Sequence, residues 1–323
     1  YSSSYNYLSF TKRLLKIEHF KVNYSVTFET LLLLCKVNCI LNKYNESDEF
    51  YSLLLKYKHT DLDHARVLLV KMDDFHQQGL YQEALDTQYL ALKVLNLAPP
   101  SELENLDAQI VNEIMLIDTY LAQHSIDSLY DSNDLEDEQI LLLLDILTSL
   151  WITAYLLSDE DVFQWASVKM CSLCLEHGRC EQSAFAYILY GFVCVNRLNE
   201  FKKADEFGKV ALKISDNYPN LALRGKVYFM YGLTICHWSN HLSFSTKSFR
   251  QSYQFSCQAG DWTYASYAAV NIISNLIIEG LPFTDVLTEA NKYLSFLKEK
   301  NEESTKSFFI PGAYVPLLHL MDK

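Results

Sequence analysis

The chain has 323 residues, with 27 lysines and arginines against 40 aspartates and glutamates, and a net charge of −13. This length exceeds one compact core, so the chain forms either two domains or an elongated array in which each unit contacts its neighbours. Six prolines and nine glycines are too few for the turns of a sandwich or barrel, and no β-branched runs alternate with helices as in an α/β protein. The composition therefore favours an all-α array.

The first third of the chain reads as consecutive helices. Apolar residues recur at helical spacing over residues 5–17, 24–41 and 45–57. A fourth helix is expected over residues 61–79, because Asp61 is suited to cap its start and Gly79 to end it.

A repeat signature begins at that glycine. Gly79, Tyr81, Ala84 and Ala91 match the second half of a tetratricopeptide unit, with a glycine at the turn and alanines where helices cross closely. A second copy surrounds Ala204, with Gly208 and Ala211, and a degenerate copy surrounds Ala166. The spacing between copies is uneven, which predicts an irregular array.

The middle of the chain is strongly acidic. No lysine or arginine occurs between Lys93 and Lys169, whereas 15 acidic residues fall between Glu102 and Asp161. We expect a helix over residues 101–123 and an acidic loop over 125–133. A nucleic-acid partner is excluded, because phosphate contacts require a basic face. The block is either a docking surface for a basic partner or a solvated face.

Residues 140–157 are apolar enough to require a membrane test, since they approach the length of a bilayer span. Acidic residues flank both ends, and no lysine or arginine marks a cytoplasmic side. We therefore expect an interior helix of a helical stack, and no membrane span.

The last third continues the helical pattern. Helices are expected over residues 181–196, 220–237, 241–259, 261–279 and 285–299, and two prolines in the tail indicate a turn that leads into a further helix. We expect one elongated array over residues 1–323, with N-terminal repeats in 1–100, an irregular acidic insertion in 101–160 and C-terminal repeats in 161–323.

The eight cysteines accompany no signal peptide, and the chain begins at Tyr1 without a methionine. We expect reduced thiols and a cytoplasmic location, on a segment taken from a longer protein. Cys171, Cys174, His177 and Cys180 have a spacing and ligand types suited to zinc. The other interpretation is a stripe of buried thiols, because the first two cysteines fall inside a helical pattern.

Five motifs occur in order along the chain: GLYQEALDTQYLALKVLNL, LEHGRCEQSAFAYILYGF, EFKKADEFGKVALKI, ICHW and QAGDWTYASYAAVN. Together they resemble the tetratricopeptide-like helical region of large multidomain signalling ATPases, which carry a Ser/Thr protein kinase domain, a signal-transduction ATPase module, a GAF domain and a histidine kinase. The resemblance is strongest over residues 173–271. It implies a sensor or linker region between catalytic modules, and none of those modules is present in this sequence.

The fold we expect is a right-handed superhelix of tetratricopeptide-like antiparallel helix pairs, an α-solenoid, whose first helices line the concave side. Aromatic and polar residues on those helices form either a groove for a peptide or small ligand, with a bidentate amide contact from the asparagine, or inter-helix packing. This set comprises Tyr187, Tyr190, Tyr228, Tyr231, Trp238, Trp262, Tyr267 and Asn271.

Catalytic motifs are missing from the sequence: there is no phosphate-binding glycine loop, no zinc-protease motif and no nucleophile elbow. We therefore expect no enzyme activity and no cofactor. The favoured function is a regulatory scaffold whose partner is a protein or peptide, the flanking ATPase or kinase modules of the same chain, or a small-molecule effector. The alternative is a metal- or thiol-dependent switch that uses the Cys171 to Cys180 cluster, and a third interpretation is a mechanical spacer.

Overall fold

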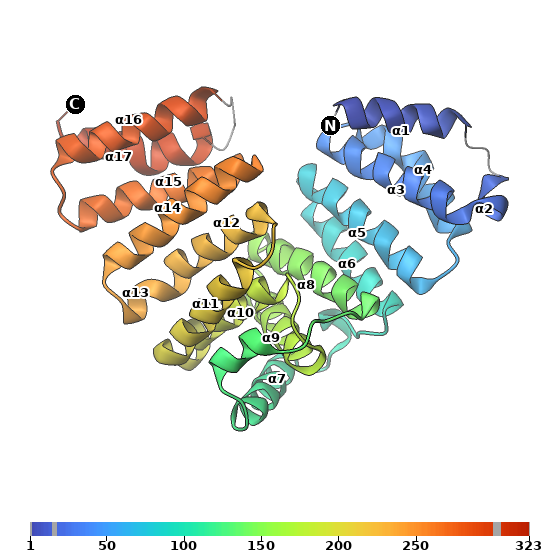
Figure 1. Cartoon of the computed structure of the whole chain (residues 1–323), viewed down its shortest axis with the longest axis horizontal. Coiled ribbons are helices and arrows are strands. Elements are labelled where there is room, and N and C mark those ends of the chain that lie inside the picture. The colour runs from blue at the N-terminus through green and yellow to red at the C-terminus, as the bar shows by residue number, and fades with distance from the viewer. Residues whose placement is uncertain (1, 15–17, 300–304, 323) are drawn as a thin grey trace. The chain divides into compact units, whose positions relative to one another are not determined.

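The computed structural model describes residues 2–14, 18–299 and 305–322, and all the regular elements in these ranges are helical (Figure 1). The all-α prediction is confirmed for them. The chain divides into two compact units, the first formed by residues 1–116 and 135–173 and the second by residues 117–134 and 174–323. Two helices, α7 (Leu106–Leu121) and α9 (Glu160–His177), contribute residues to both units. The acidic block expected over residues 101–160 is thus divided between them.

The first unit is built from consecutive antiparallel helices, in which α3 packs on α4, α5 on α6, and α6 on α8 (Figure 1). Its elements are α1 (Ser2–Leu14), α2 (His19–Val22), α3 (Tyr24–Ile40), α4 (Tyr44–Tyr57), α5 (Asp61–Gln77), α6 (Tyr81–Val94), η1 (Pro100–Glu102) and α8 (Glu138–Leu156). The helix predicted over residues 5–17 begins earlier, and its last three residues lie outside the described ranges.

The repeat signature at Gly79 corresponds to a real helix pair. Helix α5 begins with a capping box, in which the Thr60 hydroxyl accepts the backbone N–H of Asp63 at 3.0 Å. Gly79 follows the end of α5 with φ at +73°, the left-handed conformation that glycine adopts without strain. Ala84 and Ala91 of α6 are fully buried, as expected for alanines at a close helix crossing.

Among the described helices, only α8 is long and apolar enough to cross a bilayer, judged by length and composition. In the first unit 56% of its most apolar window is buried. The core helix of a soluble protein passes the same test. Polar contacts also tie α8 to α6, since the buried Gln88 side chain donates to the hydroxyl groups of Ser149 at 2.9 Å and Thr153 at 2.7 Å. The expectation of an interior helix without a membrane span stays a prediction.

The second unit continues the same arrangement. Its elements are η2 (Ile126–Asp131), α10 (Ser183–Val193), η3 (Cys194–Leu198), α11 (Phe201–Ser215), α12 (Leu221–Met230), η4 (Tyr231–Ile235), α13 (Cys236–Ser239), α14 (Leu242–Ala259), α15 (Trp262–Ile278), α16 (Phe283–Glu299), η5 (Thr305–Tyr314) and α17 (Val315–Leu320). The helix expected over residues 220–237 is interrupted by the π-helical segment η4, and the acidic loop contains the short 3₁₀ helix η2.

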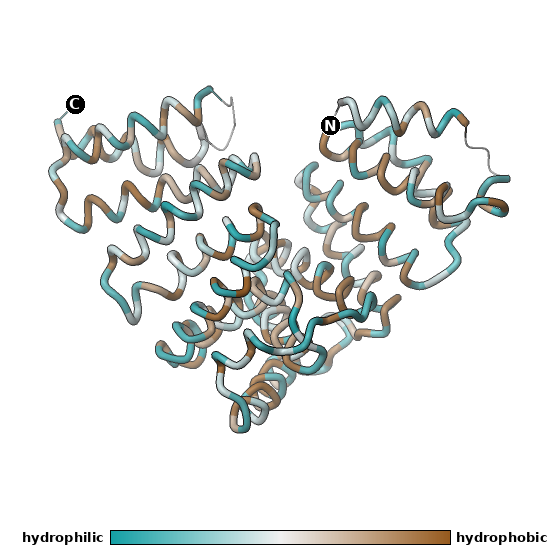
Figure 2. Tube along the Cα trace, in the orientation of Figure 1, coloured by the Kyte–Doolittle hydropathy of each residue, from teal (hydrophilic) through white to brown (hydrophobic). Residues whose placement is uncertain are grey.

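Two layers can be followed within the second unit. Helices α10, α12, α15 and η5 contact one another in succession, and each packs on a partner, namely α11, α14, α16 and α17. Figure 2 shows hydrophobic residues alternating with hydrophilic ones along these helices, so that each has an apolar stripe for its neighbours. Sequential antiparallel pairing is therefore observed in each unit, while the superhelical solenoid stays a prediction.

Candidate functional site

The α12–α15–η5 pocket lies on the first layer of the second unit. It has a volume of about 430 Å³ and is predominantly apolar. Its main lining residues are Phe229, Tyr267, Val270, Asn271, Pro311 and Gly312. Two residues of the predicted groove, Tyr267 and Asn271, therefore meet at one pocket.

Three aromatic rings fix one side of this pocket. Phe229 of α12 meets Tyr264 edge-on, with 5.5 Å between ring centroids, and Tyr267 at 5.9 Å. The rings of Tyr264 and Tyr267 are themselves 5.7 Å apart. The Lys226 amino group lies 5.4 Å from the centroid of Tyr264, within the range of a cation–π contact. This cluster joins α12 to α15 and holds the Tyr267 side chain in place.

Asn271 contributes the polar group of the pocket. Its side-chain N–H donates to the backbone carbonyl of Tyr267 at 2.9 Å, which ties the amide to its own helix. Its carbonyl oxygen Oδ1 is a hydrogen-bond acceptor. The pocket therefore combines an apolar wall with an amide that has acceptor capacity, which is a usual composition for a site that binds a peptide or a small molecule.

Three residues of the predicted groove are interior. Tyr187 and Tyr190 have 0% exposure and pack against Phe207, with ring centroids 5.8 and 4.9 Å apart. Tyr231 is also buried and donates its hydroxyl to Asp205 at 2.8 Å. All three pack against α11, so they are inter-helix packing residues and do not line a groove.

The remaining three residues lie apart from the pocket. Tyr228 donates its hydroxyl to Asp216 at 3.1 Å, and Trp262 packs on Phe296. Trp238 is 53% exposed and stacks on the ring of Phe201 at 5.1 Å.

A second, more open depression of about 740 Å³ lies beside that stack, lined by Phe201, Lys202 and Ser239 among others. The eight predicted residues thus divide between the core, the pocket and separate surfaces.

Sequence reasoning missed Phe229 and Tyr264. Tyr264 precedes Tyr267 by three residues, so the two share one face of α15, and this spacing was the available signal. Phe229 had no comparable signal, since only the packing of α12 on α15 brings it to the pocket.

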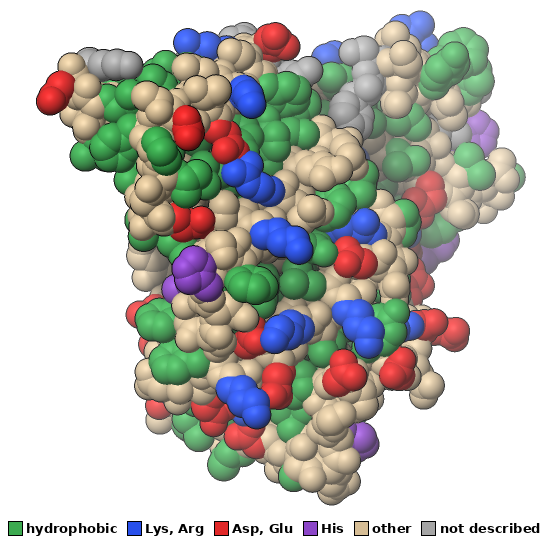
Figure 3. Space-filling model, turned by 60° about the vertical axis from the view of Figure 1, so that its left-hand side comes forward, with side chains coloured by type: hydrophobic (Ala, Val, Ile, Leu, Met, Phe, Trp, Pro, Cys, Tyr) green, Lys and Arg blue, Asp and Glu red, His purple; other side chains and the backbone are tan. Residues whose placement is uncertain are grey.

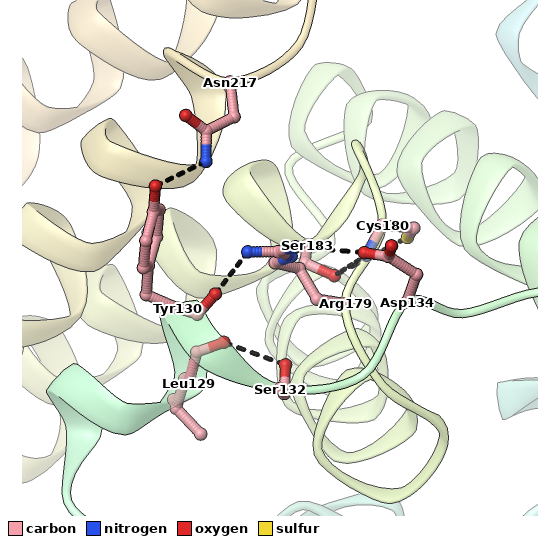
Figure 4. Close-up of polar contacts among 8 residues, drawn as sticks. All are labelled: Leu129, Tyr130, Ser132, Asp134, Arg179, Cys180, Ser183 and Asn217. Carbon is pink, nitrogen blue, oxygen red and sulfur yellow. Dashed lines mark hydrogen bonds and ion pairs between the residues drawn. The ribbon is translucent and has the colours of Figure 1, made fainter.

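The Cys174–Cys180 thiol pair lies at the junction between α9 and α10. Figure 4 shows one member of the pair, Cys180, beside Ser183. Ser183 donates its hydroxyl to the Cys174 sulfur at 3.3 Å and lies 3.5 Å from the Cys180 sulfur. The pKa of Cys180 is lowered to about 7, chiefly by a hydrogen bond from the Cys174 thiol and further by the Ser183 donors, against the opposing effect of burial.

The metal interpretation of this cluster finds no ligand set. Within the described ranges, no group of three or more histidine, cysteine, aspartate or glutamate side chains converges to hold a metal ion. Cys171 is buried in α9, and the His177 ring lies 3.7 Å from Glu176. Cys174 and Cys180 alone cannot complete a tetrahedral zinc site.

The acidic block is partly neutralised by bases of the same unit. Its ion pairs in the second unit are Asp118 with Lys203 at 2.6 Å, Asp127 with Lys213 at 3.7 Å, and Asp134 with Arg179 at 3.0 Å. Figure 3 likewise shows basic and acidic side chains interspersed over one face of the molecule. Three of the block's 15 acidic residues are therefore paired within this unit.

Arg179 attaches the η2 segment to the rest of the second unit (Figure 4). Its guanidinium donates to the backbone carbonyl of Tyr130 and to Asp134, while its backbone N–H donates to Asn133 at 2.7 Å. The Tyr130 hydroxyl in turn accepts a hydrogen bond from Asn217 at 2.7 Å. These contacts hold η2 against α11 and against the loop that precedes α10.

No protein-family model matches the chain. A stretch of 145 residues, 44% of the chain, is 27% identical to hybrid signal transduction histidine kinase G of Dictyostelium discoideum, and it covers 4% of that protein's length. The chain therefore has a distant, partial similarity to a hybrid signal transduction histidine kinase. The histidine-kinase element of the resemblance stated above agrees with this match.

Proposed function

We propose that the chain is a non-catalytic regulatory scaffold, a sensor or linker region of a multidomain signal-transduction protein with ATPase or kinase modules. The α12–α15–η5 pocket carries the proposal, because it brings an apolar aromatic wall and an amide acceptor together on the layer of helices where a tetratricopeptide-like array binds its ligand. The partial similarity to a signalling histidine kinase supports the signalling context. The occupant is a peptide segment of a protein partner or a small-molecule effector.

The proposed mechanism is a shift between two arrangements of the second unit. A ligand in the pocket contacts α12, α15 and η5 at once, so it favours the arrangement in which these three elements are closest. The neighbouring catalytic module responds to that arrangement, and the coupling free energy equals the difference in ligand affinity between the two states. We propose that this shift takes place in the cytoplasm.

The test compares one pocket-filling variant with one surface control in the full-length protein. A Cβ added at Gly312 would lie 3.5 Å from Val270, an ordinary van der Waals contact, so Gly312→Leu should occupy the pocket while the fold is retained. Trp238→Ala removes an exposed aromatic ring outside the pocket. Quantitative mass spectrometry of isolated complexes should find an occupant that Gly312→Leu loses and Trp238→Ala keeps. Equal recovery of every bound molecule with Gly312→Leu and wild type would refute the pocket's role.

The non-catalytic part of the proposal has its own test. The purified chain should hydrolyse no ATP and transfer no phosphate, whereas turnover that survives Gly312→Leu would place an enzyme activity in these residues. The alternative of a metal-dependent switch lacks a converging ligand set among the described residues. The thiol part of that alternative rests on the contacts of Cys174 and Cys180 with Ser183 and is independent of what the pocket binds.

A further inference from the structure

One serine hydroxyl brings two cysteine sulfurs together at the start of α10. Cys174 lies in the last turn of α9, Cys180 lies in the following loop, and Ser183 is the first residue of α10. The Ser183 oxygen is 3.3 Å from the Cys174 sulfur and 3.5 Å from the Cys180 sulfur, and it also accepts the backbone N–H of Cys180 at 2.9 Å. Both sulfurs therefore lie against the same hydroxyl oxygen.

The loop that carries Cys180 is positioned by polar contacts on both sides. Gly178 turns the chain with φ at +111°, and Arg179 is fixed to Asn133 and Asp134. Cys180 itself is buried, but Gly178, Arg179 and Glu181 are half-buried. Cys180 therefore lies at the edge of the core, next to partly exposed residues on both sides.

Cys180 differs from the other buried cysteines in reactivity. Its lowered pKa raises the thiolate fraction at neutral pH, and the thiolate is the nucleophilic form. Burial instead raises the pKa of Cys35 and of Cys194 to about 12, so these two thiols stay protonated. A second thiol held beside the first by a shared hydroxyl is the arrangement of a sensor cysteine with its resolving partner.

We propose that Cys174 and Cys180 are a reversible oxidation site that closes to a disulfide on reaction with a hydroperoxide. The Cys180 thiolate attacks one peroxide oxygen, the O–O bond breaks, and hydroxide or alkoxide leaves, which gives a sulfenic acid. The Cys174 thiol then attacks that sulfur, the S–S bond forms, and water leaves. Two exchanges with a dithiol reductant restore both thiols.

The disulfide would fix the turn that presents Arg179 to η2. It closes a short loop between the end of α9 and the start of α10, which restricts the unfolded chain. The midpoint of thermal unfolding should therefore rise on oxidation and return on reduction, and Cys174→Ser should abolish this shift.

Trypsin makes the linkage easy to identify. Cleavage after Lys169, Arg179 and Arg197 releases residues 170–179 and residues 180–197 as separate peptides. After treatment with hydrogen peroxide and blocking of the remaining thiols, the two peptides should appear as one disulfide-linked species that dithiothreitol separates. Fragmentation should assign the bond to Cys174 and Cys180, because each peptide contains one further cysteine, Cys171 or Cys194.

Four serine variants give the matched controls. Cys171→Ser and Cys194→Ser should keep the linked species, whereas Cys174→Ser and Cys180→Ser should lose it, with helicity checked by circular dichroism in each. The hydrogen peroxide concentration is raised until the half-buried Cys257 is oxidised. Absence of the linkage at that point, a bond that involves another cysteine, or accumulation of Cys180 sulfinic acid without linkage would overturn the proposal.

Discussion

Two regions of the second unit are held in place by different forces. Helix α11 packs on α10 through apolar contact, with Phe207 fully buried between Tyr187 and Tyr190. The η2 segment contributes one buried apolar side chain, Leu129, and is otherwise attached through Arg179 and other charged or aromatic partners. The first contact is mainly hydrophobic packing and the second is mainly electrostatic.

The difference predicts how each region responds to solvent conditions. Burial of apolar surface is insensitive to moderate salt, and loss of core packing affects the whole cooperative unit. The ion pairs of η2 involve exposed carboxylates, since the side chains of Asp127 and Asp134 are 85% and 71% exposed. Such pairs contribute little each and are screened by salt. We therefore expect η2 to open locally at a lower free energy than α10–α11.

Removal of the buried ring at position 207 should have the largest effect. Phe207→Ala leaves a cavity between two tyrosine rings and should lower the free energy of unfolding by about 3–5 kcal/mol. Urea denaturation followed by circular dichroism measures this change. The matched control is Phe244→Ala, which removes an exposed ring and should stay within about 0.5 kcal/mol of wild type. Similar losses in both variants would contradict the contrast between core and surface.

A smaller change in the same core tests its packing density. In Gly208→Ala the added Cβ would lie 2.5 Å from the Tyr231 ring, which is closer than a real contact allows. Because the Tyr231 hydroxyl is held by Asp205, the ring cannot move without loss of that hydrogen bond. We expect a destabilisation of about 1–3 kcal/mol. In the background of Tyr231→Leu, Gly208→Ala should lower the free energy of unfolding by less than it does in wild type. An equal loss in both backgrounds would show that the Tyr231 ring is not the cause.

The sequence predicted the helices better than the site. Periodicity and caps located α5, α14 and α15 to within two residues, because local signals such as Gly260 and Asp261 determine helix ends. The predicted cap of α5 was wrong by one residue, since Thr60 and not Asp61 accepts the backbone N–H at its start. The sequence left open whether Tyr187 and Tyr190 line a groove or pack between helices, since periodicity places a residue on a face of a helix but does not say which neighbour covers that face. The pairing of Asp134 with Arg179 links residues far apart in the chain and leaves no periodic trace.

Loss of Arg179 should open η2 without unfolding the rest of the unit. Arg179→Ala removes the ion pair with Asp134 and the donor to the Tyr130 carbonyl, while the exposed Asp134 carboxylate stays hydrated. Hydrogen exchange of the η2 amides should become about tenfold faster, which corresponds to about 1.4 kcal/mol, with little change in α10. Added salt should accelerate hydrogen exchange of the η2 amides less in this variant than in wild type. Equal acceleration of exchange in α10 would show that Arg179 supports the core instead.

The smallest effect should come from the Tyr130 side chain, and two substitutions separate its parts. The ring lies 3.9 Å from the Lys213 amino group and 5.4 Å from the Arg179 guanidinium, and the hydroxyl accepts from Asn217. Tyr130→Phe removes the hydroxyl alone and should weaken η2 attachment by about 0.5 kcal/mol. Tyr130→Leu also removes the ring and should cost about 0.5–1 kcal/mol more. Hydrogen exchange of η2 at two salt concentrations distinguishes the two contributions, because the cation–π part is screened more than the neutral hydrogen bond. If both variants exchanged equally fast, the ring would contribute nothing and the cation–π part of the electrostatic account would fail.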